Sequence, residues 1–154
     1  MRKVLPLLAV LLCAVLLAPG VGAAKSKPRS YKFDGIVKGS DVVFTDVKGD
    51  GPSPGDVYTF TLTAFDKSGQ HKLGTAHGYC VLGAPTFSTC TSVSKDGKGS
   101  IVLTWEDDGD ASTPEHLAIT GGTQRYRHIR GDGTSTQVSP SDPSTFRVKL
   151  HGTL

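Results

Sequence analysis

The chain has 154 residues, of which 37% are hydrophobic, with 17 Lys and Arg against 14 Asp and Glu. The length suits one domain, and so balanced a charge gives no reason to expect a nucleic acid or an anionic membrane as a partner. No metal or other cofactor is predicted, because the five histidines fall at no metal-ligand spacing and there is no C-x-x-C pair.

Residues 1–24 have the pattern of a secretory signal peptide. Arg2 and Lys3 precede an apolar run over 4–17 that is short for a bilayer span, and small residues follow at 20–24. Cleavage after Ala23 or Ala24 is expected, and the cleavage site disfavours the alternative of an uncleaved anchor. The sequence therefore predicts a secreted protein with no membrane attachment after cleavage.

A short basic lead over 25–30, "KSKPRS", is expected to be disordered, and β-strand patterns begin at residue 31. Apolar and polar residues then alternate with a period of two, most clearly in "VYTFTLTAFD" (57–66), and no stretch shows helical spacing. The other expected strands lie at 31–38, 41–47, 71–82, 85–93, 100–106, 116–120, 126–138 and around 146–151.

These segments amount to roughly eight strands and predict an all-β domain over 31–154, an eight-stranded antiparallel closed barrel of calycin-like type with an internal cavity. Two stacked sheets are the alternative. Closure is favoured because it leaves no exposed edge, and eight strands can enclose one small ligand.

Two cysteines, Cys80 and Cys90, remain after signal cleavage, since Cys13 lies in the apolar run. In an oxidising compartment the simplest expectation is one disulfide that closes a short loop.

The segment "AITGGTQRYRHIRG" (118–131) resembles the pattern A-I-x-G-G-T-G-x-Y/F-x-x-A-R-G of the allene oxide cyclase and dirigent barrel superfamily. Residues 51–80 are similar to that family's Pro-Gly-Asp, strand, Asp-x-x-Gly hairpin and Gly-x-x-x-Gly-x-Cys. The resemblance covers roughly 31–151. It implies a barrel with a cavity for a small hydrophobic organic molecule. Because such relatives are commonly trimeric or dimeric, a homo-oligomer is also an option.

Two departures from the pattern stand out. Gln124 replaces the last Gly of Gly-Gly-Thr-Gly, so the backbone is strained there if the position needs a positive φ. His128 and Ile129 replace the usual Gly-Ala pair and add bulk beside Arg130.

A strand that starts at Tyr126 would place Tyr126, His128, Arg130 and Asp132 on one face. Resemblance to dirigent proteins implies that Arg130 faces the cavity, where it could hold a ligand oxygen while His128 or Asp132 moves a proton. The alternative is a solvated face, with Arg127 and Ile129 turned inward. The candidate ligand-binding residues are Tyr58, Phe60, Trp105, Tyr126, His128, Arg130 and Asp132; the catalytic residues are not identified.

Three other motifs have simpler interpretations. Gly121 and Gly122 are expected to form a sharp reversal between strands, because a phosphate cradle would need a helix after the glycines. The Arg-Gly-Asp at 130–132 falls within an expected strand, not on a protruding loop. "EDDGD" (106–110) lacks the register of a calcium loop and is expected to be a solvated hairpin tip.

The leading hypothesis is a secreted barrel that binds a small hydrophobic molecule and guides its stereoselective coupling or cyclisation. The second is a true cyclase or isomerase similar to allene oxide cyclase. The third is a surface or matrix protein in which the barrel is only a scaffold. The sequence does not decide whether the protein is an enzyme.

Overall fold

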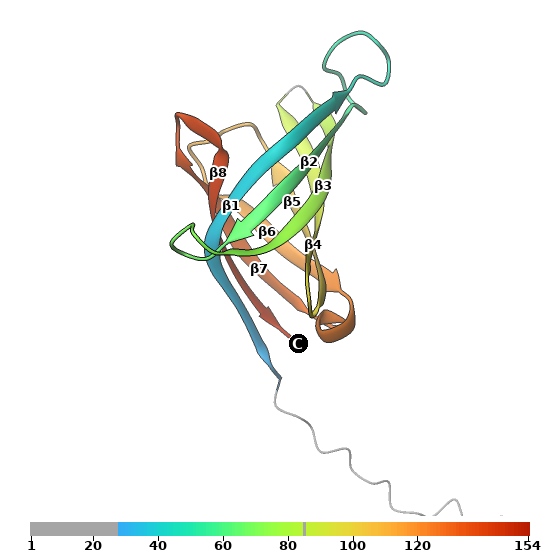
Figure 1. The fold of residues 1–154 in the computed structure, drawn as a ribbon. Helices are drawn as coiled ribbons and strands as arrows, with labels where there is room; N and C mark the ends of the chain where they lie inside the picture. Colours follow the sequence, from blue (N-terminus) through green and yellow to red (C-terminus); the bar gives the residue numbers. More distant parts are fainter. Residues whose placement is uncertain (1–27, 85) are drawn as a thin grey trace, which may run out of the picture.

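The computed structural model describes residues 28–84 and 86–154, so the predicted signal peptide and residues 25–27 of the basic lead lie outside the described residues. Eight antiparallel strands follow one another around a closed barrel in which β1 pairs with β8 (Figure 1). The predicted fold class is therefore confirmed. The strands are β1 (Ser30–Thr45), β2 (Val57–Phe65), β3 (Lys72–Ala84), β4 (Phe87–Asp96), β5 (Gly99–Asp107), β6 (Glu115–Gly122), β7 (Arg130–Ser139) and β8 (Asp142–Thr153).

The long strand β1 combines the two strands expected at 31–38 and 41–47. Its first part pairs with β8, and a register shift between Ser40 and Val43 lets it continue along β2. Asp41 lies within this irregularity with a φ of 53°. Such a bulge bends a strand without ending it, so two predicted strands form one.

The segment between β6 and β7 differs from the expected strand 126–138. Gln124–Tyr126 forms a 3-10 turn, η2, and β7 begins only at Arg130. Gly121 and Gly122 do not form the reversal, because they pair with Val102 and Ile101 of β5. The chain reverses at 123–129, where Gln124 has a φ of 51°, so the condition under which backbone strain is expected at this departure from the family pattern is met.

The turn η2 closes one end of the barrel. Tyr126 and Ile129 are buried there in a cluster with Ile119 and Leu150. The Tyr126 hydroxyl donates to Asp96 Oδ2 at 2.8 Å, and its ring meets the Tyr31 ring edge-on at 5.7 Å between centroids. Burial raises the pKa of the Tyr31 hydroxyl to about 12. Part of the segment that carries the family resemblance (118–131) thus covers this end of the barrel, which we call the closed end.

The opposite end, which we call the open end, carries the loops at 46–56 and 108–114 and the turn between β7 and β8. Asp56, fully buried, accepts hydrogen bonds from the backbone amides of Val47 (2.9 Å) and Ser53 (2.7 Å) and holds the first of these loops against β2. In the described part of the chain, no helix is long and apolar enough to cross a membrane.

Candidate functional site

The barrel encloses a cavity of about 640 Å³. All eight strands contribute to its wall, because the inward side chains of each strand recur at every second position. In β2 the alternating residues Tyr58, Phe60, Leu62 and Ala64 all line the cavity, as do alternating residues of β5 and β8. The principal apolar lining residues are Phe33, Tyr58, Phe60, Leu62, Leu82, Ile101, Leu103, Trp105, Phe146, Val148 and Leu150.

Aromatic rings form one side of the cavity. Phe60 of β2 and Trp105 of β5 lie with ring centroids 6.0 Å apart. Gly78 of β3, which pairs with Phe60, leaves room for that ring, since a Cβ at Gly78 would lie 2.5 Å from it. Packing against Phe60 therefore explains why a glycine stands at position 78 of the segment that resembles the family.

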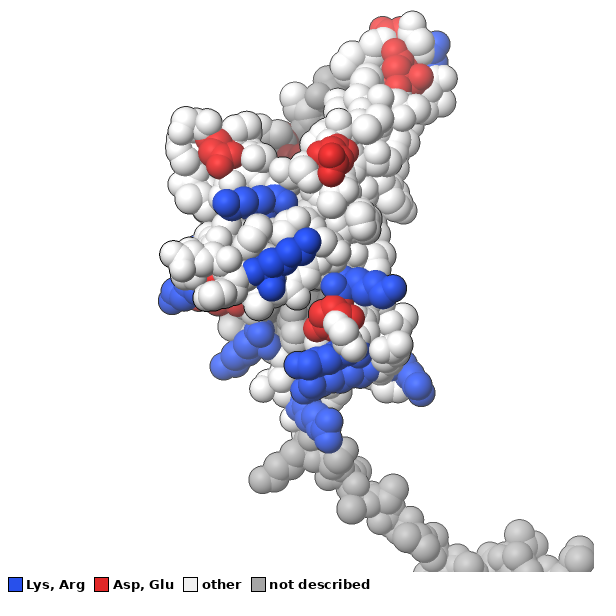
Figure 2. Space-filling view, in the orientation of Figure 1, with Lys and Arg blue, Asp and Glu red and all other residues white. Residues whose placement is uncertain are grey.

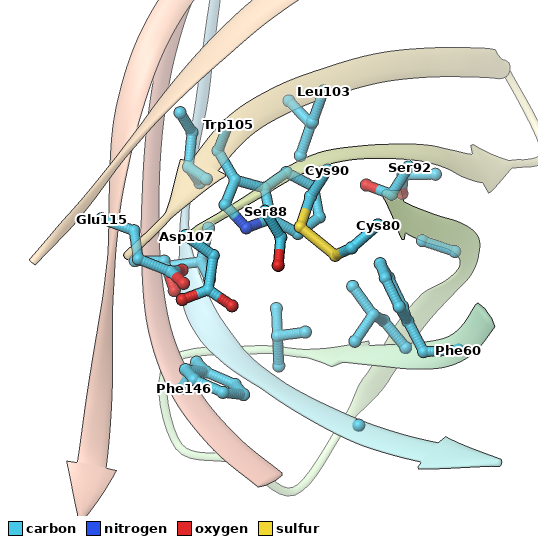
Figure 3. A pocket seen from close by; sticks show the side chains of 18 of the residues that line it. Phe60, Cys80, Ser88, Cys90, Ser92, Leu103, Trp105, Asp107, Glu115 and Phe146 are labelled. Atoms are coloured by element: carbon cyan, nitrogen blue, oxygen red, sulfur yellow. A yellow bond between two sulfur atoms is a disulfide. The ribbon is translucent and has the colours of Figure 1, made fainter. Parts of the chain in front are cut away.

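The predicted disulfide is confirmed and forms part of the cavity wall. Cys80 of β3 and Cys90 of β4 are directly paired across the two strands, with Cα atoms 4.0 Å apart, and both line the cavity. Figure 3 shows the sulfur bridge beside Trp105.

Two carboxylates enter the cavity at the open end. Asp107 is the last residue of β5 and Glu115 the first of β6, and Figure 3 shows their carboxylates near one another, with Trp105 on one side and Phe146 on the other. Burial raises the pKa of Glu115; the Ser135 hydroxyl opposes this rise, and the charges of Asp107 and Asp108 add to it. Among the described lining residues these are the only charged groups, with no Lys, Arg or His.

Serine hydroxyls complete the polar part of the lining. Ser88 pairs with Asp107, and Ser135 pairs with Glu115, so both flank the carboxylates. Ser92 lies further along β4, only 1% exposed, and its Oγ has no hydrogen-bond partner among the described residues. A buried hydroxyl without a partner is costly unless a water or a ligand satisfies it.

The candidate ligand-binding residues divide into two groups. Tyr58, Phe60 and Trp105 line the cavity, whereas the four candidates of the 126–132 segment do not. His128, Arg130 and Asp132 are exposed, and Tyr126 is buried in the closed end.

Arg130 does not point inward as the dirigent resemblance implied. Its guanidinium folds back to donate to the carbonyl of Ile129 at 2.7 Å. Because η2 interrupts the expected strand, the four side chains do not share a face. The alternative expectation, a solvated face with Arg127 and Ile129 turned inward, holds only in part: Ile129 is buried, but Arg127 is exposed.

Sequence reasoning missed Asp107, Glu115, Ser88 and Ser92 as cavity residues. The segment "EDDGD" was expected to be wholly solvated, but Asp107 keeps the alternation of Leu103 and Trp105 and turns inward. The spacing of two residues from Trp105 to Asp107 was therefore a signal in the sequence that Asp107 faces the cavity. Ser88 and Ser92 likewise follow the alternation of Cys90.

A scan against models of protein families finds no match for this chain, and a search among curated proteins finds none either. The hollow antiparallel barrel nevertheless defines a class that contains several solved structures.

The chain is similar to a pyocyanin demethylase, with 24% identity over 79% of this chain and 99% of the other, at a TM-score of 0.60. It is also similar to the Diels–Alderase AbmU from Streptomyces koyangensis (18% identity, 80% of this chain and 63% of the other, TM-score 0.66). A pterocarpan synthase dirigent protein is similar too (14% identity, 80% of this chain and 94% of the other, TM-score 0.64). These likenesses show that the chain shares its barrel fold with these proteins, and none of the three points to allene oxide cyclase in particular.

Proposed function

We propose that this protein is secreted, binds a small hydrophobic organic molecule inside its barrel and guides the coupling or cyclisation of that molecule. The observation that carries the proposal is the cavity of about 640 Å³ with its aromatic and aliphatic wall. Pockets for small organic ligands have volumes and linings of this kind.

A confined ligand can react with stereochemical preference without a dedicated nucleophile. Holding a flexible molecule in one reactive geometry removes part of the entropic cost of reaction and can lower a barrier by several kcal/mol. The solved structures with this fold include a Diels–Alderase and a dirigent protein, and both names describe reactions in which the geometry of the substrate matters.

A second candidate function is that of a true cyclase or isomerase, and Glu115 favours it. Glu115 lines the cavity, and burial raises the pKa of its carboxyl, which makes it a candidate to transfer a proton to or from a bound molecule. In this proposal Glu115 takes the proton-transfer role that the sequence suggested for His128 or Asp132.

Ligand binding can be tested with the neutral fluorescent probe N-phenyl-1-naphthylamine. Trp105, the single tryptophan of the chain, lines the cavity, so quenching of its emission reports occupancy. We expect saturable binding that Ala76→Phe weakens by tenfold or more, because Ala76 also lines the cavity and a larger side chain fills it.

Ala118→Phe is the matched control, since Ala118 is exposed on β6 and absent from the lining. Circular dichroism of both variants confirms folding. If the unmodified protein bound no probe and no small molecule were extracted from it after purification, the scaffold hypothesis would replace this proposal.

A further inference from the structure

The cavity is chemically asymmetric, and the asymmetry concerns charge. The described lining contains two carboxylates and no cationic side chain. Both carboxylates lie at the open end, while the wall beyond them is uncharged.

The loops around the open end are also negatively charged, like the two carboxylates inside it. Residues 106–115 include five acidic side chains and no basic one, and the loop 46–56 includes three Asp and one Lys. At the closed end the segment 123–130 carries three Arg and no acidic residue. Figure 2 shows Lys and Arg mostly over the lower half of the visible face, away from the open end at the top. A mouth of one sign attracts ligands of the other sign.

A second, independent polar feature lies deeper in the cavity. The Ser92 hydroxyl is buried in the same wall without a hydrogen-bond partner among the described residues, so a bound molecule can satisfy it. Ser92 is four residues from Ser88 along β4, which corresponds to roughly 13 Å of strand. One elongated molecule could therefore contact Ser92 at one end and the carboxylates at the other.

We propose, as a refinement that depends on the proposed function, that the ligand of this cavity is an organic cation: an apolar, aromatic body with a protonated nitrogen at the end that lies between Asp107 and Glu115. The two carboxylates accept hydrogen bonds from the ammonium group. Trp105 and Phe146 lie on either side of the two carboxylates, and a cation over an aromatic face is further stabilised.

The same arrangement disfavours fatty acids and other carboxylates. An anionic head group at the open end would lie beside two like charges with no Lys, Arg or His in the described lining to neutralise it. An anion turned the other way would place its charge among apolar side chains, which is costlier still.

Three probes with one apolar body and different head groups test this inference: 1-naphthylmethylamine, 1-naphthylmethanol and 1-naphthoate. Isothermal titration calorimetry at neutral pH and low salt is expected to rank the unmodified protein's affinity as amine, then alcohol, then carboxylate. The amine should bind about tenfold or more tightly than the alcohol, as expected for charge-assisted hydrogen bonds. This ranking requires no variant and so does not depend on a variant's folding.

The double variant Asp107→Asn/Glu115→Gln keeps the shape of both side chains and removes their charge. It should lower amine affinity to about that of the alcohol and leave alcohol binding within about twofold. Asp132→Asn, on the outside of β7, should change neither value.

The outcomes separate the two proposals. If the alcohol bound but the amine bound no more tightly, or if 1-naphthoate bound best, the charge preference would be overturned while the apolar cavity function stood. Survival of the amine preference in the folded double variant would overturn it as well. Binding of none of the three probes would refute the proposed function, and this refinement with it.

Discussion

At the scale of single residues, Gln124 stands where the pattern that this chain resembles has a glycine. Its φ of 51° lies in the left-handed region, where a side chain with a Cβ costs about 1–2 kcal/mol. The hydrogen bonds of the turn, from the amides of Tyr126 to Thr123 (2.9 Å) and of Ile129 to Tyr126 (3.0 Å), hold the residue there. They seat Tyr126 and Ile129 in the closed end, so the local strain is offset by burial.

Replacing Gln124 with glycine should therefore stabilise the protein. We expect Gln124→Gly to raise the free energy of unfolding by about 0.5–1 kcal/mol, since relief of strain exceeds the entropy that glycine adds to the unfolded chain. Urea denaturation followed by circular dichroism measures it. Gln124→Ala keeps the Cβ and should give no such gain; equal stability of the two variants would contradict the strain argument.

At the scale of elements, the β3–β4 pair combines a structural and a functional role. The register that places Cys80 opposite Cys90 also turns both side chains into the cavity. The disulfide thus ties two strands together and supplies part of the ligand wall. The same logic applies to β5 and β6, whose facing ends bring Asp107 and Glu115 to one rim.

Reduction of the Cys80–Cys90 bridge should lower the free energy of unfolding by about 3 kcal/mol. The bridge spans ten residues, and the loss follows from the entropy that the unfolded chain regains when a loop of that length opens. Urea unfolding with and without reductant gives the difference. The urea midpoint of a Cys80→Ala/Cys90→Ala variant should not change when reductant is added. An equal urea midpoint for the oxidised and reduced forms of the unmodified protein would show that the bridge does not stabilise the fold.

At the scale of the whole molecule, the ionisable groups respond to acid in two opposite ways. Hydrogen bonds to their carboxylates lower the pKa values of several surface aspartates, so these groups stabilise the fold above their usual pKa of 3.8 and lose that contribution as the pH falls below it. The aspartates concerned are Asp34, Asp46, Asp66, Asp110 and Asp142.

Glu115 behaves in the opposite sense, because burial raises its pKa above the usual 4.5. Its contribution to stability is therefore complete below that value and is lost as the pH rises through the raised pKa.

The free energy of unfolding should consequently rise slightly as the pH falls from neutral toward about 4.5 and then decline steeply below 3.8. Thermal unfolding measured across this range checks the profile. Glu115→Gln should remove the rise and keep the acid decline. A rise of the same size in that variant would assign it to another group.

Most strands and their antiparallel order could be predicted from the sequence, because alternation with a period of two and the spacing of turns are local properties of the chain; β1 was expected as two strands, and β7 was expected to begin at 126. The disulfide followed from the two cysteines that remain after the signal peptide. The same alternation correctly placed Tyr58, Phe60 and Trp105 on inward faces. The signal peptide, the homo-oligomer and the ligand itself stay predictions.

Only the tertiary structure decided which residues meet inside the barrel. Alternation gives a strand two faces, but closure and register determine which positions of neighbouring strands share a level, and so bring Asp107 of β5 and Glu115 of β6 together at the open end. The tertiary structure also decided the place of Arg130, because the left-handed residue at 124 begins η2, which closes one end of the barrel and delays the start of β7 until Arg130. A local pattern cannot contain this information, since the interior of a barrel is formed by contacts between residues that are distant in the chain.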